Sequence, residues 1–313
     1  MIQEQLIIIG NGPAGCSAAV YAARAGLKPR IFAGDLPCGL LTQTSEVENF
    51  PGFTDGIDGL DLVMAIQMQA EKFGAVVDYD TVTAINFAPG NNTMTTADGR
   101  EFSAPAVIIA TGASPRFTGV PGEERLRGHG VSACATCDGA FFKDVPVVVA
   151  GGGDSAMEEA LFLTRFASQV HLVHRRDTFR ASAIMVERAR ANGKITFHLN
   201  SIITEITGSG EVDGVKISDK ETNATELIPA KAFFAALGHT PATELFKAAG
   251  VATDENGYII VENNTSLTNI PGVFAAGDCM DPRYRQASVA AGNGVKAALD
   301  AEKYLADYAA KQQ

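Results

Sequence analysis

Residues 6–15 read Leu-Ile-Ile-Ile-Gly-Asn-Gly-Pro-Ala-Gly, and an alanine-rich stretch follows as far as Gly26. Four consecutive apolar residues predict a buried strand, and the alanine-rich stretch predicts a helix. Glycines spaced in this way between a strand and a helix are typical of a dinucleotide site, because they allow a tight turn and bring backbone close to a pyrophosphate. The predicted contacts are Gly10, Gly12, Pro13, Ala14 and Gly15.

The same order of elements returns about one domain later. Residues 147–150 are apolar, a second glycine turn covers residues 151–156, and a predicted helix over 157–166 and strand over 169–173 follow. Two such turns predict two nucleotide sites or a duplicated fold. The predicted contacts in the second turn are Gly151, Gly153, Asp154, Ser155 and Ala156.

Cations follow the second predicted site, where residues 174–180 read His-Arg-Arg-Asp-Thr-Phe-Arg. A site that prefers NAD usually has an acidic residue here for the free ribose hydroxyl, whereas arginines suit a 2′-phosphate. The alternative is a solvated basic turn. The pattern favours NADPH, held by His174, Arg175, Arg176 and Arg180. The first predicted site has Ala33 and Gly34 at the corresponding position, and Asp35 is a weak substitute for the expected acid.

Two thiols lie between the glycine turns, in Cys134-Ala135-Thr136-Cys137-Asp138. Cysteines at this spacing fit either redox chemistry or half of a zinc site. The other three cysteines are isolated and the five histidines have no ligand spacing, so no metal site is predicted. The order of nucleotide, thiols and nucleotide favours a redox pair, Cys134 and Cys137, with Asp138 as the group that carries a proton.

Length and charge limit the remaining possibilities. The 313 residues suggest two domains, and the net charge of −11 argues against general nucleic-acid binding. The first residues lack a basic region and no membrane span is evident, so we expect a cytoplasmic protein. Five cysteines fit a reducing compartment in which a disulfide would be catalytic.

Two segments rich in proline and glycine, residues 114–121 and 238–241, are expected to connect the domains. If the segment between them is one domain, the other is discontinuous. The predicted arrangement is residues 1–116 and 243–313 in a flavin-binding domain and residues 117–242 in an NADPH-binding domain that carries the thiols. A domain that two chain segments connect to the other domain can rotate as a rigid body.

Several motifs in this order resemble the low-molecular-weight thioredoxin reductases, NADPH-dependent flavoproteins of the pyridine nucleotide-disulfide family. They are residues 10–15, 46–52, 110–113, 134–138, 151–156, 174–180, 277–278 and 285–287. The resemblance implies an α/β fold of two Rossmann-like domains in three ββα layers, the second inserted into the first. It also implies electron flow from NADPH to FAD, to the Cys134–Cys137 disulfide and to thioredoxin or a thioredoxin-like protein, in a homodimer.

The resemblance also implies roles for individual residues. Cys137 would lie nearer the flavin and Cys134 would attack the partner's disulfide. The flavin site would include Asn49, Thr111, Gly112, Gly277, Asp278, Arg285, Gln286 and Ala287. Taken alone, Asp278 could instead cap the last helix and Asn49 could hold a turn.

The chain departs from this family at two places. Members usually have Gly-Gly-Gln-Leu-Thr where this chain has Cys38-Gly39-Leu40-Leu41-Thr42, so Leu40 removes a polar side chain expected near the flavin. His129 stands where many relatives have a docking cation before the cysteines. Both differences bear on flavin binding and partner preference.

Three other functions are compatible with parts of this pattern, and one feature of the sequence argues against each. A flavoprotein of the peroxiredoxin system normally has an additional N-terminal thioredoxin-like portion with its own cysteine pair, and this sequence shows none. A ferredoxin-dependent relative would lack the arginines at positions 175, 176 and 180. A non-catalytic flavin-binding redox sensor would not require the complete set of Cys134, Cys137 and Asp138.

Overall fold

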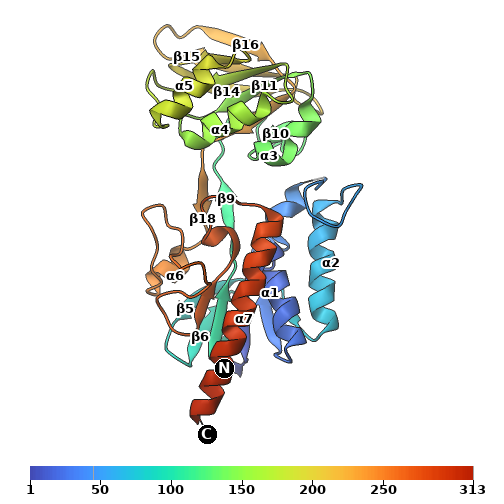
Figure 1. Cartoon of the computed structure of the whole chain (residues 1–313), viewed down its shortest axis with the longest axis vertical. Coiled ribbons are helices and arrows are strands. Elements are labelled where there is room, and N and C mark those ends of the chain that lie inside the picture. The colour runs from blue at the N-terminus through green and yellow to red at the C-terminus, as the bar shows by residue number, and fades with distance from the viewer. Residues whose placement is uncertain (45, 313) are drawn as a thin grey trace. The chain divides into compact units, whose positions relative to one another are not determined.

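The chain folds into two units, the second inserted into the first. The computed structural model describes residues 1–44 and 46–312. The first unit comprises Met1–Ser114 and Thr240–Gln313, and the second comprises Pro115–His239 (Figure 1). These divisions fall after residues 114 and 239, two and three residues before the predicted boundaries at 116 and 242.

The first unit is built on a parallel sheet of five strands in the order β19-β8-β2-β3-β4. Its strands are β2 (Leu6–Ile9), β3 (Pro29–Phe32), β4 (Val76–Asp78), β8 (Ala106–Ile109) and β19 (Val273–Ala275). One face is covered by α1 (Pro13–Arg24), α2 (Gly59–Lys72) and α7 (Ala287–Gln312). The other face is covered by the sheet β1-β7-β6-β5, formed by Ile2–Gln3, Glu101–Ala104, Asn92–Thr96 and Val82–Asn86.

Alternation along β2 explains why this strand is apolar throughout. Leu6 and Ile8 pack against alanines of α1 and α7, whereas Ile7 and Ile9 pack against the second sheet, including Phe102. Because both faces of a central parallel strand are covered, both sets of side chains must be apolar. The small alanines let the helices lie close to the sheet.

The second unit repeats this design. Its parallel sheet has the order β10-β17-β11-β12-β13, formed by Val131–Ser132, Ala232–Ala235, Pro146–Ala150, Gln169–Val173 and Ile195–His198. Helices α3 (Ala135–Asp138), α4 (Asp154–Leu163) and α5 (Ala183–Ala191) belong to one side of it. The antiparallel strands β14 (Ser201–Thr207), β15 (Gly214–Asp219) and β16 (Thr225–Pro229) cover the other side. The two units confirm the predicted three-layer ββα fold.

Short elements complete the chain. In the first unit these are η1 (Gly39–Gln43), α6 (Glu244–Ala248) and η3 (Gly277–Cys279), and in the second η2 (Gly139–Phe142). The strands β9 (Ala113–Pro115) and β18 (His239–Pro241) pair where the chain passes between the units. No helix in the described part of the chain combines the length and apolarity needed to cross a bilayer.

Candidate active site

The first glycine turn joins β2 to α1 and has no room for side chains at two of its glycines. Gly10 has a φ of +105°, and a Cβ there would lie 2.3 Å from the carbonyl oxygen of Ala110. A Cβ on Gly15 would lie 1.8 Å from the carbonyl oxygen of Gly10, whereas nothing lies within 4 Å of a Cβ on Gly12. Internal packing therefore requires two glycines, and the open space at Gly12 lets a ligand approach the backbone.

Helix α1 begins at this turn with amide groups that no side chain caps. Gly12 is its N-cap residue, Pro13 starts the first turn, and among the described residues no side chain accepts a capping hydrogen bond. Uncapped amides at a helix N-terminus form a favourable site for a phosphate group. The five predicted contacts of residues 10–15 thus lie together on one turn at the start of α1.

Gly277 and Asp278 lie against the start of α1. A Cβ on Gly277 would be 2.8 Å from the Cβ of Ala14, and α7 approaches closely enough that a Cβ on Gly294 would be 2.0 Å from the carbonyl oxygen of Ala14. Burial raises the pKa of Asp278 to about 6, with Asp281 adding to the shift and Arg285 opposing it. In the described part of the chain its carboxylate accepts no hydrogen bond, so it is available to a ligand hydroxyl.

Thr111 and Gly112 form a turn beside Gly10. The Thr111 hydroxyl donates a hydrogen bond to the carbonyl oxygen of Ala242 at 2.7 Å, and Gly112 has a φ of +70°. The Thr111 side chain therefore stabilises the first unit, and the backbone of residues 111 and 112 is the part that can contact a ligand.

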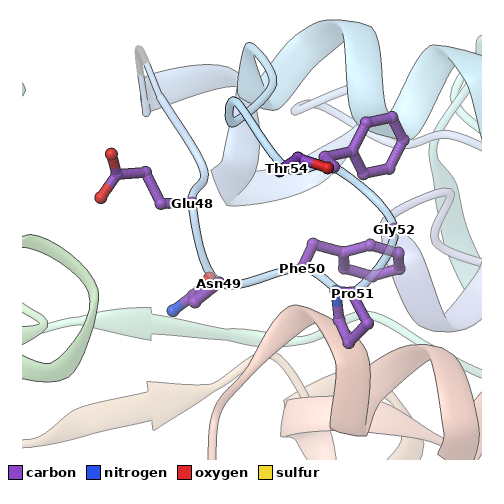
Figure 2. A pocket seen from close by; sticks show the side chains of 7 residues that line it. Glu48, Asn49, Phe50, Pro51, Gly52 and Thr54 are labelled. Atoms are coloured by element: carbon purple, nitrogen blue, oxygen red, sulfur yellow. The ribbon is translucent and has the colours of Figure 1, made fainter.

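Asn49 lies beside the segment that precedes α7. Its side-chain amide donates to Oε1 of Gln286 at 3.3 Å, while Arg285 has a φ of +46° and donates to the carbonyl oxygen of Pro282. Residues 48–54 line a hollow of about 430 Å³, and Figure 2 shows the side chains of these residues. The hydrogen bond joins Asn49 to Gln286, which lies 237 residues along the chain. Ala287, the next residue, begins α7.

A buried polar cluster beneath the first glycine turn has no signal in the sequence. Asn11 is 1% exposed, and its Oδ1 accepts a hydrogen bond from the Cys38 amide at 2.7 Å. Its Nδ2 donates to Gln67 at 3.0 Å, and Gln67 donates in turn to Tyr79 at 2.9 Å. Asn11 therefore ties the glycine turn to the loop over residues 36–40 and to α2.

Cys38 adopts a backbone conformation that favours glycine. Its φ is +65°, in the left-handed region, and the family that the sequence resembles usually has glycine here. Gly39 follows with a φ of +70°, and a Cβ on it would lie 3.4 Å from the Cα of Gly12. The hydrogen bond from Cys38 to Asn11 holds this turn against the glycine turn.

Replacing Asn11 with alanine is expected to lower the free energy of unfolding by about 1–3 kcal/mol, because the Cys38 amide and Gln67 lose a buried partner. Denaturant unfolding followed by circular dichroism measures the change. Asn91→Ala is the matched control, since Asn91 is exposed. Equal stability of the two variants would contradict a structural role for Asn11.

The second glycine turn joins β11 to α4. A Cβ on Gly151 would lie 2.5 Å from the carbonyl oxygen of Ala236, and one on Gly152 would lie 2.1 Å from the His174 ring. Gly153 is the N-cap residue of α4, without a side-chain cap, and nothing lies within 4 Å of a Cβ on it. As in the first turn, the first residue is tightly packed and the third is open, and the helix start is again uncapped among the described residues.

Asp154 uses one oxygen of its carboxylate within the turn itself. Oδ1 accepts hydrogen bonds from the Ser182 amide and hydroxyl, both at 2.8 Å. The hydrogen bond from the amide is the main cause that lowers the Asp154 pKa. The amide of Arg180 donates to the carbonyl oxygen of Gly152 at 2.8 Å. These bonds fold residues 180–182 back onto the glycine turn, so Asp154 positions the Arg180 segment.

Exposed cations surround this turn. Arg175, Arg176 and Arg180 are exposed, and none forms an ion pair within residues 1–44 and 46–312. Lys220 adds a fourth cation for which the sequence gives no local signal: its Nζ donates a hydrogen bond to the carbonyl oxygen of Arg175 at 3.4 Å. The arrangement is able to bind a phosphate group.

His174 packs inside this turn instead of extending into solvent. Its Nε2 lies 3.0 Å from the carbonyl oxygen of Thr178, and its ring stacks on Phe179 at 5.1 Å. Burial lowers the pKa of His174, and the three neighbouring arginines lower it further. The neutral ring therefore shapes the turn and covers Gly152.

Cys134 and Cys137 form a disulfide at the start of α3. The S–S distance is 2.07 Å and the Cα atoms are 5.3 Å apart. The Cys134 carbonyl accepts hydrogen bonds from the amides of Cys137 and Asp138 at 3.2 and 3.1 Å. One helical turn therefore holds both sulfurs and the adjacent carboxyl group. Burial raises the pKa of Asp138, and a hydrogen bond from Ser132 opposes this.

The other cysteines and the histidines form no comparable centre. Cys16, Cys38 and Cys279 are free and buried. His171 and His198 pair with each other at 3.0 Å. Among the described residues, no three His, Cys, Asp or Glu side chains are arranged to hold a metal ion.

Comparisons with known proteins agree with this site. The family described as pyridine nucleotide-disulphide oxidoreductase matches residues 4–294. A thioredoxin reductase of Mycolicibacterium smegmatis is 52% identical, over 97% of this chain and 97% of the relative. A bifunctional thioredoxin reductase/thioredoxin of Mycobacterium leprae is 48% identical, over 98% of this chain and 67% of the relative. The solved thioredoxin reductase of Giardia duodenalis has a TM-score of 0.93 and 44% identity, covering 98% of this chain and 100% of that one. The chain belongs to the pyridine nucleotide-disulphide oxidoreductase family, among its thioredoxin reductases.

Proposed function

We propose that this chain reduces the disulfide of thioredoxin with electrons from NADPH, using FAD in the first unit, NADPH in the second unit and its own Cys134–Cys137 disulfide. The observation that carries the proposal is this disulfide, with Asp138 on the same helical turn, in a unit that also has an uncapped helix start among exposed arginines.

The residues present fit the two nucleotides. In the first unit, the open space at Gly12 and the carboxylate of Asp278, which has no hydrogen-bond donor in the described chain, suit a pyrophosphate and a sugar hydroxyl. In the second unit, Gly153 would face the pyrophosphate and Arg175, Arg176 and Arg180 would face the 2′-phosphate. Bound there, nicotinamide and flavin would supply the hydride chemistry that brings two electrons to the disulfide.

Asp138 would donate and accept the proton that accompanies these electrons. Opening the Cys134–Cys137 bond with two electrons leaves two thiolates, which must be stabilised or protonated. Because burial raises the pKa of Asp138, its protonated form persists to higher pH than that of a solvated aspartate. It can therefore give a proton to the leaving sulfur and accept one when a thiol is next deprotonated.

The dithiol would then reduce the partner in two exchanges. The Cys134 thiolate attacks one sulfur of the partner's disulfide, forming a mixed disulfide and releasing the other sulfur as a thiolate. Cys137 attacks the Cys134 sulfur, which restores the internal disulfide and releases the partner as a dithiol. Two electrons pass to the partner in each cycle.

Phe141 offers the partner an apolar contact near the disulfide. Phe141 is 45% exposed, whereas its neighbour Phe142 packs on Phe234 with ring centroids 5.8 Å apart. Phe141→Ala is expected to raise the KM for thioredoxin about 10-fold with little change in kcat, because uniform binding is lost. Steady-state kinetics measure the effect. Leu227→Ala is the control, being an exposed apolar change on β16, and a similar rise there would contradict the assignment.

The first unit has a surface suited to a homodimer. Exposed apolar side chains come from α1, α2 and the β4 region, namely Tyr21, Met68, Phe73, Val76 and Tyr79, with Met68 and Tyr79 60% and 62% exposed. β4 is also an edge strand of its sheet. Such a surface favours association. A mass of one chain by light scattering would contradict the homodimer. We also propose a cytoplasmic location, where reducing conditions keep the three free cysteines as thiols.

The function is tested on the purified protein by two readings. Flavin released by heat should be identified as FAD by chromatography. NADPH oxidation should depend on added oxidised thioredoxin and not on a peroxiredoxin or a ferredoxin. A protein without flavin, or one that serves another acceptor in preference to every thioredoxin in a panel, would overturn the proposal.

A further inference from the structure

A hairpin of the second unit reaches the arginine turn, the segment of residues 174–180, and brings a lysine with it. Strands β15 and β16 are joined by residues 220–224, and Lys220 is the first residue of this connection. Its Nζ donates a hydrogen bond to the carbonyl oxygen of Arg175 at 3.4 Å. Because the Lys220 side chain is exposed, its ammonium group lies at the surface of the arginine turn.

The backbone of the arginine turn is held by residues around Lys220. The carbonyl oxygen of His174 accepts a hydrogen bond from the Ser201 amide at 3.0 Å, and that of Arg176 accepts one from the Asn200 amide at 3.3 Å. The carbonyl oxygen of Asn200 accepts in turn from the Lys220 amide at 2.8 Å. Lys220 is therefore joined to the arginine turn through its backbone, by way of Asn200, as well as through its side chain.

The connection after β15 is closed by hydrogen bonds of its own. Oδ1 of Asp219 accepts from the amides of Glu221 and Thr222 at 2.9 and 2.8 Å. The Asp219 amide donates to the carbonyl oxygen of Ala224 at 2.9 Å. An aspartate that bonds the following amides stabilises a tight turn. Lys220 is thus presented by a turn with a defined backbone, directly after a strand.

The charge of Lys220 is not neutralised by an acid. Acids flank it in sequence, yet it forms no ion pair within residues 1–44 and 46–312. Asp219 bonds the amides of the hairpin, and Oε1 of Glu221 accepts from Nδ2 of Asn200 at 2.9 Å. The Lys220 ammonium group contacts a backbone carbonyl instead, which leaves its charge available to an anion.

Lys220 therefore adds to a group of like charges. Arg175, Arg176 and Arg180 are also exposed and lack ion pairs in the described chain. Cations gathered around one turn repel one another, and a bound dianion relieves this repulsion. An ammonium group is a compact charge with rotatable donors, so it complements the planar bonds of arginine to a phosphate.

We propose that Lys220 is a specificity-determining residue for the nucleotide of the second unit, supplying from the β15–β16 hairpin a positive charge for the 2′-phosphate that distinguishes NADPH from NADH. The inference rests on the proposed function for its choice of nucleotide. It assigns part of this selectivity to an element 45 residues beyond Arg175.

The test measures binding without turnover, by calorimetry on the complete protein saturated with FAD. The probes are adenosine 2′,5′-bisphosphate and adenosine 5′-monophosphate, which differ by the 2′-phosphate alone. Lys220→Gln removes the charge but keeps a donor for the Arg175 carbonyl. It is expected to raise the Kd for the bisphosphate about 10-fold and to leave that for the monophosphate unchanged. Lys220→Arg, which keeps the charge, should stay within about 3-fold of the parent.

Lys216→Gln is the matched control, because Lys216 lies on the same hairpin and pairs with Glu205 at 2.6 Å. It should bind both probes as the parent does. An unchanged Kd for the bisphosphate in Lys220→Gln would show that Lys220 only supports the backbone of the turn and would overturn the proposal. An equal loss for both probes would overturn it as well, because the effect would then be general.

The parent protein gives a second readout that does not depend on the folding of a variant. Its lysines are acetylated with an N-hydroxysuccinimide ester, and the extent of modification at each is read by mass spectrometry. The bisphosphate should protect Lys220 and the monophosphate should not, while Lys216 is modified equally with either. Equal modification of Lys220 with and without the bisphosphate would contradict the proposal.

The results also separate this inference from the proposed function. If the parent and Lys220→Gln prefer the bisphosphate to the same degree, the proposed function stands and the role of Lys220 is refuted. If Lys220→Gln loses the preference but the parent does not reduce thioredoxin, the role of Lys220 stands and the proposed function is refuted. A parent that binds both probes equally would refute both.

Discussion

Cys137→Ser is expected to lower NADPH-dependent thioredoxin reduction by about 1,000-fold or more, because a serine hydroxyl cannot take part in thiol–disulfide exchange. The disulfide with Cys134 is lost, so no dithiol can form on α3. The measurement is the rate at which thiols appear in thioredoxin. Flavin content and the bleaching of flavin colour by NADPH should persist, because these depend on residues outside the thiol pair.

Cys38→Ser is the matched control for this change. Cys38 is a buried free thiol in the first unit, outside the predicted thiol pair. Its variant should retain most of the parent activity. Full thioredoxin reduction by Cys137→Ser would refute the dithiol mechanism, and equal losses in both variants would point to a general effect of removing a thiol.

Replacing Arg175, Arg176 and Arg180 together with alanine is expected to lower kcat/KM for NADPH about 100-fold or more, since charge-assisted bonds to a phosphate are lost. The value for NADH should change little, because NADH has no 2′-phosphate. Steady-state rates with the two nucleotides measure the ratio. In the parent protein the preference for NADPH should weaken as salt is added, because these arginines are exposed.

Arg188→Ala is the control for the arginine variant. Arg188 is an exposed cation on α5 of the same unit, away from the glycine turn in sequence. It should leave the nucleotide preference unchanged. A parent protein that prefers NADH, or an equal loss for both nucleotides in the triple variant, would contradict the assignment of these arginines to a 2′-phosphate.

Sequence patterns predicted strands that other elements cover on both faces. The apolar run over residues 6–9 is β2, and the run over residues 169–173 is β12, because both strands are covered on two faces. The last helix, α7, continues to Gln312. Tertiary contacts extend it, since Tyr308 stacks on Tyr304 and donates a hydrogen bond to the carbonyl oxygen of Gly90. The start of α4 was predicted at residue 157 and lies at Asp154, directly after the glycine turn.

The site was predictable where its chemistry lies within one short segment. The disulfide, Asp138 and the two glycine turns are each contained in fewer than seven consecutive residues, so local spacing reveals them. Asn11 was missed because its partners Cys38 and Gln67 are 27 and 56 residues away. The bond between the Asp154 carboxylate and Ser182 was missed for the same reason, because Ser182 lies 28 residues along the chain. Such pairings depend on tertiary packing and leave no local pattern. The nucleotide contacts themselves stay predictions.

The stoichiometry of the complete reaction tests whether electrons from NADPH reach thioredoxin through the Cys134–Cys137 disulfide. Purified protein is mixed with limiting NADPH and excess oxidised thioredoxin under anaerobic conditions, and NADPH oxidised is compared with thiols formed in thioredoxin. We predict two thiols for each NADPH, with the reaction abolished in Cys137→Ser. Oxidation of NADPH without formation of thiols, or formation of thiols at the full rate by Cys137→Ser, would contradict the account.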